Sequence, residues 1–368
     1  MKKYIPFLEL GTLHQQIADE LKEKFLEVLG EGIFSAGKEV AMFEKKVGNL
    51  LKVSYAIPCS NGTDALELAL TALEIGPGDE VIVPALTWTS TAEAVVNVGA
   101  KPIFCDVDQD GLIAVSEAEK LVTTRTKGMI PVHLYGKMVD MKRLLNFAHQ
   151  HQLRVIEDGA QAFGAFQQGI SAGAFGDIGC FSFYPTKNLG ALGEAGLLTT
   201  KEEILAKRLR FILNHGQSER NVHELVGRNS KIDTLQAAFL NVKLRHFDTW
   251  QNIRKRWASH YLKELQEVKA FHLPHDILNA DHNAHLFTIR FNQRDTLKDY
   301  LEKQGIGTAV HYPASLPKTK AFYSLSSFPV AEEIARTTLS LPLHPLLKEE
   351  ELMLICGKIK DFFRLQSS

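Results

Sequence analysis

Short apolar runs alternate with helix-like periods between residues 53 and 200, and this alternation constrains the fold more than any other feature. Strands are expected at residues 53–58, 80–84, 102–106, 128–134, 153–157, 178–183 and 196–199. Helices are expected between them, at residues 64–73, 89–98, 117–121 and 141–151. Strands that alternate with amphipathic helices predict an α/β fold, with a mostly parallel sheet between layers of helices. Functional groups on such sheets collect at the carboxyl ends of the strands.

The pattern changes after residue 200. Residues 233–267 predict one long helix, which Asp248 can interrupt. Beyond it, strands are expected at residues 285–291 and 307–312, and helices at residues 296–304 and 349–365. We therefore expect two domains. Residues 1–248 form an N-terminal arm and a large domain that includes the start of the long helix, and residues 249–368 form a smaller C-terminal α+β domain.

The composition argues against several classes of function. The chain has 368 residues and a formal net charge of −1, so no global positive field attracts nucleic acid or an anionic membrane. No run of about 18 apolar residues is present to cross a membrane, and the first apolar run is too short for an export signal. The four cysteines are widely spaced, which predicts free thiols in a reducing cytoplasm. No metal-binding spacing, dinucleotide or P-loop fingerprint, or serine-nucleophile motif occurs.

One lysine stands between an aromatic strand and a run of glycines. Residues 181–190 read FSFYPTKNLG, so Lys187 follows the strand expected at 178–183. At a strand end that faces a cleft, partial desolvation can lower the pKa of a lysine until a free amine is present. A free amine can form a Schiff base with a carbonyl cofactor. The alternative is an ordinary exposed loop lysine.

A carboxylate ends another expected strand. Asp158 follows an apolar run and precedes small residues, so it can reach a ligand that lies across the sheet edge. Beside a pyridine nitrogen, a carboxylate keeps that nitrogen protonated, and the ring can then accept electrons. Gln161, one short step along, can donate to the phenolic oxygen of such a ring. The alternative is that Asp158 caps the next helix or forms a structural ion pair.

A third segment, CSNGTDAL at residues 59–66, follows a strand and opens a helix. Gly62 and Thr63 offer backbone N–H groups and a hydroxyl to an anion, aided by the helix dipole. Ser182 can add a second hydroxyl to such a phosphate site. Plain capping of the helix explains the same segment.

Three further positions lie at junctions between expected elements. Trp88, between a strand and a helix, can stack on a planar ring or fill the core. Residues 227–233 precede the long helix and suit a phosphate or a substrate, although helix capping explains their polar groups equally well. His311 ends the strand expected at 307–312, where a lone histidine is more often structural than catalytic.

Taken together, these segments resemble the DegT/StrS-type nucleotide-sugar aminotransferases, which have the aspartate-aminotransferase (fold type I) architecture. The resemblance covers nearly the whole chain, because many motifs occur in the family's order. They are IPFLEL (5–10), NGTDAL (61–66), HLYG (133–136), EDGAQ (157–161), the Lys187 segment, NHG (214–216), NSKIDTLQAA (229–238), HYP (311–313) and SLPLHP (340–345). The resemblance implies a large domain that binds pyridoxal phosphate on a mostly parallel mixed sheet, with a smaller C-terminal α+β domain.

The resemblance also implies a role for each candidate residue. Lys187 would hold pyridoxal 5′-phosphate as a Schiff base, and Asp158 would pair with its pyridine nitrogen. The other cofactor contacts implied are Gly62, Thr63 and Ser182 at the phosphate, Trp88 and Gln161 at the ring, and Asn229 at the phosphate held by the neighbouring subunit. The substrate-side residues implied are Lys231, His311 and Tyr312. A homodimer with shared active sites follows from the role of Asn229.

The activity implied is a ping-pong transamination. L-Glutamate would donate the amino group, pyridoxamine phosphate would be the intermediate form, and a nucleotide-linked keto-sugar would accept it. The NGTDAL motif and residues 308–313 look most like branches that act on 3-keto sugars, and a 4-keto sugar remains open. The family's usual setting is surface polysaccharide assembly. A pyridoxal-binding regulatory or sensor protein of the same fold is the alternative.

Two positions depart from the family pattern. Trp88 stands where members commonly have Phe or Tyr, a swap that preserves stacking. Lys231 stands where they commonly have Arg, and lysine lacks the bidentate fork of a guanidinium. The dehydratase branch replaces the Schiff-base lysine with histidine, so the presence of Lys187 favours transamination.

Overall fold

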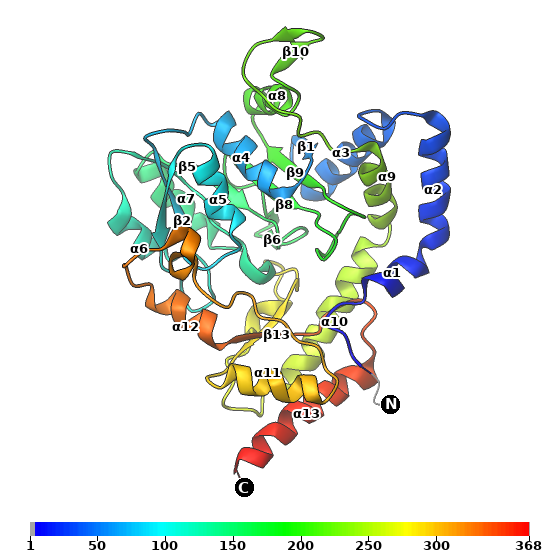
Figure 1. The fold of residues 1–368 in the computed structure, drawn as a ribbon, viewed down its shortest axis with the longest axis vertical. Coiled ribbons are helices and arrows are strands. Elements are labelled where there is room, and N and C mark those ends of the chain that lie inside the picture. Colours follow the sequence, from blue (N-terminus) through cyan, green and yellow to red (C-terminus); the bar gives the residue numbers. More distant parts are fainter. Residues whose placement is uncertain (1–3, 368) are drawn as a thin grey trace.

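The centre of the molecule is a seven-stranded sheet (Figure 1). The computed structural model describes residues 4–367, with side chains as far as Arg364. The strand order is β1-β9-β8-β5-β4-β2-β3, and every neighbouring pair is parallel except the two that β9 makes with β1 and β8. The strands are β1 (Tyr55–Cys59), β2 (Glu80–Pro84), β3 (Lys101–Cys105), β4 (Thr126–Met129), β5 (Arg154–Asp158), β8 (Ile178–Ser182) and β9 (Gly196–Thr200). The α/β fold with a mostly parallel sheet is confirmed.

Alternate residues of the central strands face two separate cores, because successive side chains of a strand point to opposite faces. In β2, Ile82 packs into one core, whereas Val81 and Val83 pack into the other. The first core includes side chains of α3 (Lys38–Leu51), α7 (Met141–Gln150) and α9 (Thr234–Lys243). The second includes side chains of α4 (Gly62–Ala72), α5 (Ser90–Asn97) and α8 (Glu203–Ile212). The sheet is therefore covered by helices on both faces.

A third core lies in the C-terminal part of the chain. It is built on a two-stranded antiparallel sheet, β12 (Phe287–Arg290) with β13 (Thr338–Leu341). The helices that contribute to it are α10 (Phe247–Leu265), α11 (Arg294–Lys303) and α13 (Glu349–Ser367). The domain boundary expected between residues 248 and 249 falls in the first turn of α10, and the two-domain division stays a prediction.

Three expected elements differ in the structure. The long helix expected at 233–267 is two helices, because residues 244–246 form a turn between α9 and α10. The strand expected at 128–134 begins earlier and ends at Met129, since Pro131 has no N–H to donate to a ladder. Residues 307–312 are not a strand: only Ala309 forms a bridge, to Ser340, and the chain then leaves the small sheet.

The remaining elements connect or flank these units. The other helices are α1 (Leu10–Gln16), α2 (Ala18–Glu31), α6 (Val115–Ala118) and α12 (Pro329–Thr337). The short strand pairs are β6 (Phe166–Gln167) with β7 (Ile170–Ser171), and β10 (Gln217–Glu219) with β11 (Val222–His223). Single 3₁₀ turns are η1 (Glu119–Leu121), η2 (Leu134–Gly136), η3 (His275–Leu278), η4 (Leu316–Lys318) and η5 (Lys320–Phe322). In the described part of the chain, no helix combines the length and the apolar character that crossing a bilayer requires.

Candidate active site

A cavity of about 800 Å³ lies at the carboxyl ends of the central strands. Four connections of the sheet line it: residues 61–64 after β1, 87–91 after β2, 158–161 at the end of β5, and 182–187 after β8. His285, His311 and Tyr312 line it from the C-terminal part of the chain. Parallel strands bring their carboxyl ends to one edge, so segments far apart in sequence meet there.

Lys187 lies in a tight turn after β8 and faces this cavity. Its backbone N–H donates to the Tyr184 carbonyl at 2.9 Å, and the Ala191 N–H donates to the Phe183 carbonyl at 2.7 Å, which closes the turn. Burial lowers the pKa of the Lys187 ammonium to about 8, while the nearby Asp158 carboxylate acts in the opposite direction. The side chain therefore offers a substantial fraction of free amine near neutral pH. It is not an ordinary exposed lysine.

Asp158 is the last residue of β5, and only 6% of its surface is exposed. The Thr91 hydroxyl donates to Oδ2 at 2.8 Å, and the Ala160 N–H donates to Oδ1 at 3.2 Å. Burial raises the pKa of the carboxyl group, and the hydrogen bond from Thr91 opposes that rise. No helix begins after β5, and no ion pair to Asp158 occurs among the described residues, so neither structural alternative applies. This buried carboxylate shares the cavity with Lys187.

The side-chain amide of Gln161 has a defined orientation. The backbone N–H of Tyr135, which can only donate, lies 2.6 Å from Oε1. Nε2 is therefore the group that faces the Tyr312 hydroxyl, at 2.9 Å. Gln161 thus presents a hydrogen-bond donor to the cavity, near the carboxylate of Asp158.

The start of α4 forms the end of the cavity nearest β1. Asn61 caps this helix, since its Oδ1 accepts the Asp64 N–H at 2.8 Å. Thr63 and Ser90 join their hydroxyls at 2.8 Å. A Cβ at Gly62 would lie 2.7 Å from the Cβ of Ser182, so only glycine permits this approach of helix to strand. Capping is thus real, yet the first N–H groups of α4 and three hydroxyls still line the cavity and suit an anion.

Aromatic residues form another wall. Trp88 is 58% exposed, so it is not a core tryptophan. Its ring centroid lies 5.7 Å from that of Tyr312, with the planes at 42°. His311 hydrogen-bonds the Ser340 hydroxyl through Nδ1 at 2.8 Å, and burial lowers the pKa of His311 to about 4. A planar ligand can reach the open face of Trp88 from the cavity.

Two predicted site residues do not line the cavity. Asn229 is exposed and forms a bridge with Asn214. Lys231 donates from Nζ to the side-chain carbonyl of Asn214 at 2.6 Å. Their predicted roles toward a neighbouring subunit and a substrate stay predictions.

The sequence interpretation missed three supporting side chains. Thr91, in the run TWTST at 87–91, holds Asp158, and its only signal was the density of hydroxyls. Glu157, fully buried beside Asp158, accepts the N–H groups of residues 173, 175 and 176 and contacts His133 Nε2 at 3.0 Å. His285 lines the cavity beside Lys187, and no pattern in the sequence pointed to it. Among the described residues, no cluster of three or more potential metal ligands occurs.

The sequence and the fold both match known proteins. The DegT/DnrJ/EryC1/StrS aminotransferase family matches residues 15–360. A UDP-N-acetyl-3-dehydro-α-D-glucosamine 3-aminotransferase of Acidithiobacillus ferrooxidans is 42% identical to this chain, over 97% of both chains. A protein of Geobacillus stearothermophilus named pleiotropic regulatory protein is 39% identical, over 98% of this chain and 99% of its own. The crystal structure of DesV from S. venezuelae with a ketimine intermediate superposes with a TM-score of 0.94, at 36% identity over 98% of each chain. The chain belongs to the DegT/DnrJ/EryC1/StrS aminotransferase family.

Proposed function

We propose that this enzyme uses pyridoxal 5′-phosphate to move an amino group from L-glutamate to a nucleotide-linked sugar that carries a 3-keto group. The observation that carries the proposal is that Lys187 and Asp158, 29 residues apart in sequence, line one cavity. An amine whose pKa is lowered by burial and a buried carboxylate are the two groups that this cofactor's chemistry requires.

The residues present fit the cofactor. The close approach of α4 to Ser182, which only Gly62 permits, brings the start of this helix and the Ser182 hydroxyl together where they would bind a phosphate group. Lys187 would hold the aldehyde carbon, and Asp158 would face the ring nitrogen. Gln161 would donate from Nε2 to the ring oxygen, and Trp88 would cover the ring face. When bound, the cofactor supplies an aldehyde that condenses with amines and a ring that accepts electron density.

Side chains of the protein would then transfer the protons and hold the charge. With a donor amino acid bound, the free Lys187 amine would take the proton from the donor's Cα and deliver it to the carbon that had carried the aldehyde. Asp158 keeps negative charge beside the ring nitrogen, and Thr91 holds that carboxylate in place at 2.8 Å. The keto acid would leave with the oxygen of a water molecule, and the same residues would act in reverse order on the keto-sugar.

The acceptor assignment is supported by the 3-dehydro sugar in the printed name of the Acidithiobacillus relative. A cavity of about 800 Å³ has room for more than the cofactor, as a nucleotide-linked sugar requires. Lys231, His311 and Tyr312 stay on the substrate side in this proposal. A 4-keto sugar is the competing acceptor, and surface polysaccharide assembly is the setting that the family favours.

We also propose a homodimer in which Asn229 completes the neighbouring site. Asn229 is exposed and lies outside the lining of its own chain's cavity, which supports a contact with another subunit. The four cysteines are free and buried, in keeping with a cytoplasmic location, which stays a prediction.

The test of the cofactor lysine is direct. Purified protein should be yellow, and borohydride should fix the cofactor on the peptide that contains Lys187. Lys187→Ala should lower the glutamate half-reaction at least about 10³-fold, because the amine both links the cofactor and moves the proton. The exposed Lys201→Ala is the control. Full turnover by Lys187→Ala would refute the assignment.

A panel of nucleotide keto-sugars with glutamate as donor tests the acceptor. Faster amination of 3-keto than of 4-keto sugars is expected. The reverse preference would overturn the 3-keto assignment but leave the transaminase intact.

Shared sites need their own experiment. Lys187→Ala and Asn229→Ala subunits, each inactive or weak alone, should regain activity when mixed, because one site of each mixed dimer then has both residues. An absence of complementation, with mixed dimers shown by mass, would count against sharing.

A regulatory role is the second candidate, favoured by the printed name of the Geobacillus relative. Absorbance spectra with glutamate alone separate the two. An aminotransferase converts the yellow form to the amine form, whereas a sensor binds the cofactor without that conversion.

A further inference from the structure

A buried histidine beside Lys187 has no part in the assignments above. His285 precedes β12, is 8% exposed, and lines the cavity together with Lys187. It is joined to the residue that follows the lysine: His285 Nδ1 lies 3.0 Å from the side-chain Oδ1 of Asn188. The histidine and the lysine turn are thus held together by one short contact.

The proton on this imidazole can be located from its neighbours. The Nδ2 of Asn188 lies 3.0 Å from the backbone carbonyl of Asn283, a group that can only accept, so Nδ2 must donate and the amide cannot be flipped. The same Nδ2 lies 3.0 Å from the Gln251 side-chain carbonyl. Oδ1 of Asn188 therefore faces His285 as an acceptor, and Nδ1 of His285 must carry the proton.

The other ring nitrogen is then a bare acceptor. Among the described residues, no group makes a hydrogen bond to His285 Nε2, although the residue lines a cavity that also contains an amine. Burial, and then the charges of Lys187 and Arg254, lower the pKa of His285 well below its usual range, so the imidazole stays neutral. Neutral imidazole with Nδ1–H leaves one lone pair on Nε2.

We propose that Nε2 of His285 is the hydrogen-bond acceptor that receives the Lys187 amine whenever that amine is not joined to another group. His285 is then a positioning residue for Lys187: it accepts one N–H and so sets the direction of the nitrogen lone pair. The inference rests on the proposed function only in taking Lys187 as the reactive amine. It gives the free lysine a defined place in the part of the cycle when the substrate has displaced it.

Other charged and titratable groups line the same cavity as this amine. Asp158 comes from β5 and favours the ammonium form. His311 and Tyr312 come from the segment before η4, and Glu194 from the loop before β9. The experiment must therefore change His285 without changing these four groups.

Two substitutions of His285 distinguish the loss of the acceptor at Nε2 from the loss of the histidine as such. His285→Asn keeps an amide donor at the place of Nδ1, toward Asn188, and removes the acceptor at Nε2. His285→Gln carries its amide to the distance of Nε2 and restores an acceptor there. His282→Asn is the matched control, since His282 is also buried but its Nδ1 accepts the Ala284 N–H at 2.9 Å.

The readout is the pKa of Lys187 in cofactor-free protein, from the pH dependence of acetic anhydride labelling of its peptide. His285→Asn should lower this pKa by about one unit, because an acceptor for the ammonium form is lost. His285→Gln should recover most of the shift, and His282→Asn should leave the pKa unchanged. An unchanged pKa in a folded His285→Asn protein would overturn the proposal. So would an equal shift in His282→Asn.

A second measurement is made on the wild-type protein, so that no substitution can destabilise the fold that is measured. ¹⁵N NMR of histidine-labelled wild-type protein, with His285 assigned from the His285→Gln spectrum, should show the Nδ1–H tautomer. The Nε2–H tautomer, or a charged ring at pH 7, would overturn the proposal. Neither measurement involves glutamate or a sugar, so a failure of the proposed reaction would leave this result standing, and the reverse also holds.

Discussion

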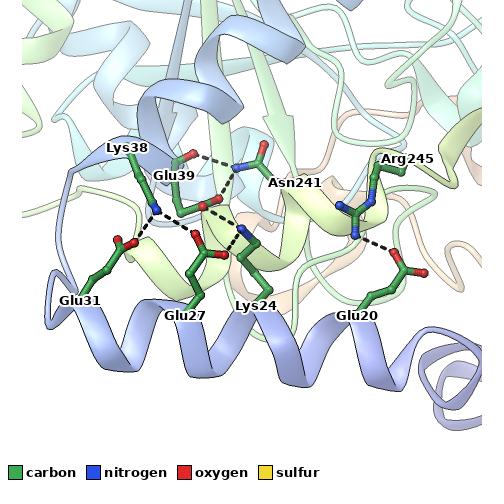
Figure 2. A network of polar contacts seen from close by, with 8 residues as sticks. All are labelled: Glu20, Lys24, Glu27, Glu31, Lys38, Glu39, Asn241 and Arg245. Carbon is green, nitrogen blue, oxygen red and sulfur yellow. Dashed lines mark hydrogen bonds and ion pairs between the residues drawn. The ribbon is translucent and has the colours of Figure 1, made fainter.

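Charged side chains are arranged in opposite ways at the cavity and along α2. Between α2 and α3, lysines and glutamates pair with one another in a largely exposed network (Figure 2). Lys38 contacts Glu27 at 2.7 Å and also Glu31, and Lys24 contacts Glu27 at 2.6 Å and Glu39 at 3.1 Å. The hydrogen bonds from Lys24 and Lys38 lower the pKa of Glu27 to about 2. Each charge in this network is stabilised by a partner.

At the cavity the same side-chain types lie without such partners. Lys187 and Asp158 are close enough to influence each other, but burial outweighs that attraction and shifts the pKa of each toward its neutral form. Lys38, by contrast, has its pKa raised by the hydrogen bonds that it donates to Glu27 and Glu31. The comparison teaches that burial with an incomplete partner, and not the residue type, lowers the pKa of a lysine.

After the loss of Lys187, removal of the buried Asp158 carboxylate should have the largest effect on the reaction rate. Asp158→Asn should slow the glutamate half-reaction by about 10² to 10³-fold, because a neutral amide cannot hold positive charge on a ring nitrogen. Stopped-flow absorbance measures the rate. Glu27→Gln, in the surface network, should leave it unchanged. A rate for Asp158→Asn within tenfold of wild type would contradict the assigned role.

The pH dependence of the amine tests the lowered pKa itself. Only neutral amine reacts with an aldehyde, and for a pKa of about 8 the neutral fraction falls roughly fifty-fold between pH 8 and pH 6. The rate of pyridoxal phosphate capture by cofactor-free protein should follow this fall and level off above pH 8. A rate that continues to rise up to pH 10.5 would mean that Lys187 keeps an ordinary pKa.

The residue that holds Asp158 gives a smaller effect. Thr91→Val keeps the shape of the side chain and removes the donor to Oδ2, so the pKa of Asp158 should rise further and the half-reaction should slow about tenfold. Thr87→Val is the matched control, since the Thr87 hydroxyl contacts Thr91 at 3.1 Å and makes no contact with the carboxylate. Equal losses in both variants would point to packing and not to the hydrogen bond.

The surface network should yield the smallest change. Lys24→Met removes a partner of Glu39, which is buried and keeps the Asn241 Nδ2 donor at 2.9 Å. We expect a loss of about 1 kcal/mol in the free energy of unfolding, measured with urea, and unchanged turnover. Lys38→Met, at a more exposed pair, should change stability less. A clear loss of activity in either variant would connect the network to the cavity.

Much of the sheet could be predicted, because buried parallel strands are continuous apolar runs. β2 lies at the residues expected for it, 80–84, where EVIVP is buried throughout. Residues 307–312, GTAVHY, are also partly apolar and were expected as a strand, yet they form none. Two tertiary contacts set the path of these residues: Ala309 bridges to Ser340, and the chain then turns to bring Tyr312 against Gln161. A short run cannot reveal such a tertiary constraint.

The candidate site also contains residues that the sequence could predict and residues that it could not. That Lys187 and Asp158 line one cavity could be predicted, because each stands at the end of an apolar run expected as a strand. Thr91 and His285 could not, since their roles depend on which atom they face. The tautomer of His285 depends on a carbonyl at Asn283 and an amide at Asn188, which are 95 residues apart. Only the folded chain brings these groups together.

The two adjacent acids of β5, Glu157 and Asp158, affect the register in which that strand pairs with its neighbours. Glu157 needs the three N–H groups of residues 173, 175 and 176, which lie on the face of the sheet away from Asp158. If β5 slipped by one residue so that Asp158 took the place of Glu157, its shorter side chain would enter that nest of amides, and Glu157 would take the place of Ile156 in the apolar core. Both carboxylates would then be poorly solvated at once. The chemistry at the end of this strand therefore also selects against misaligned pairing while the sheet assembles.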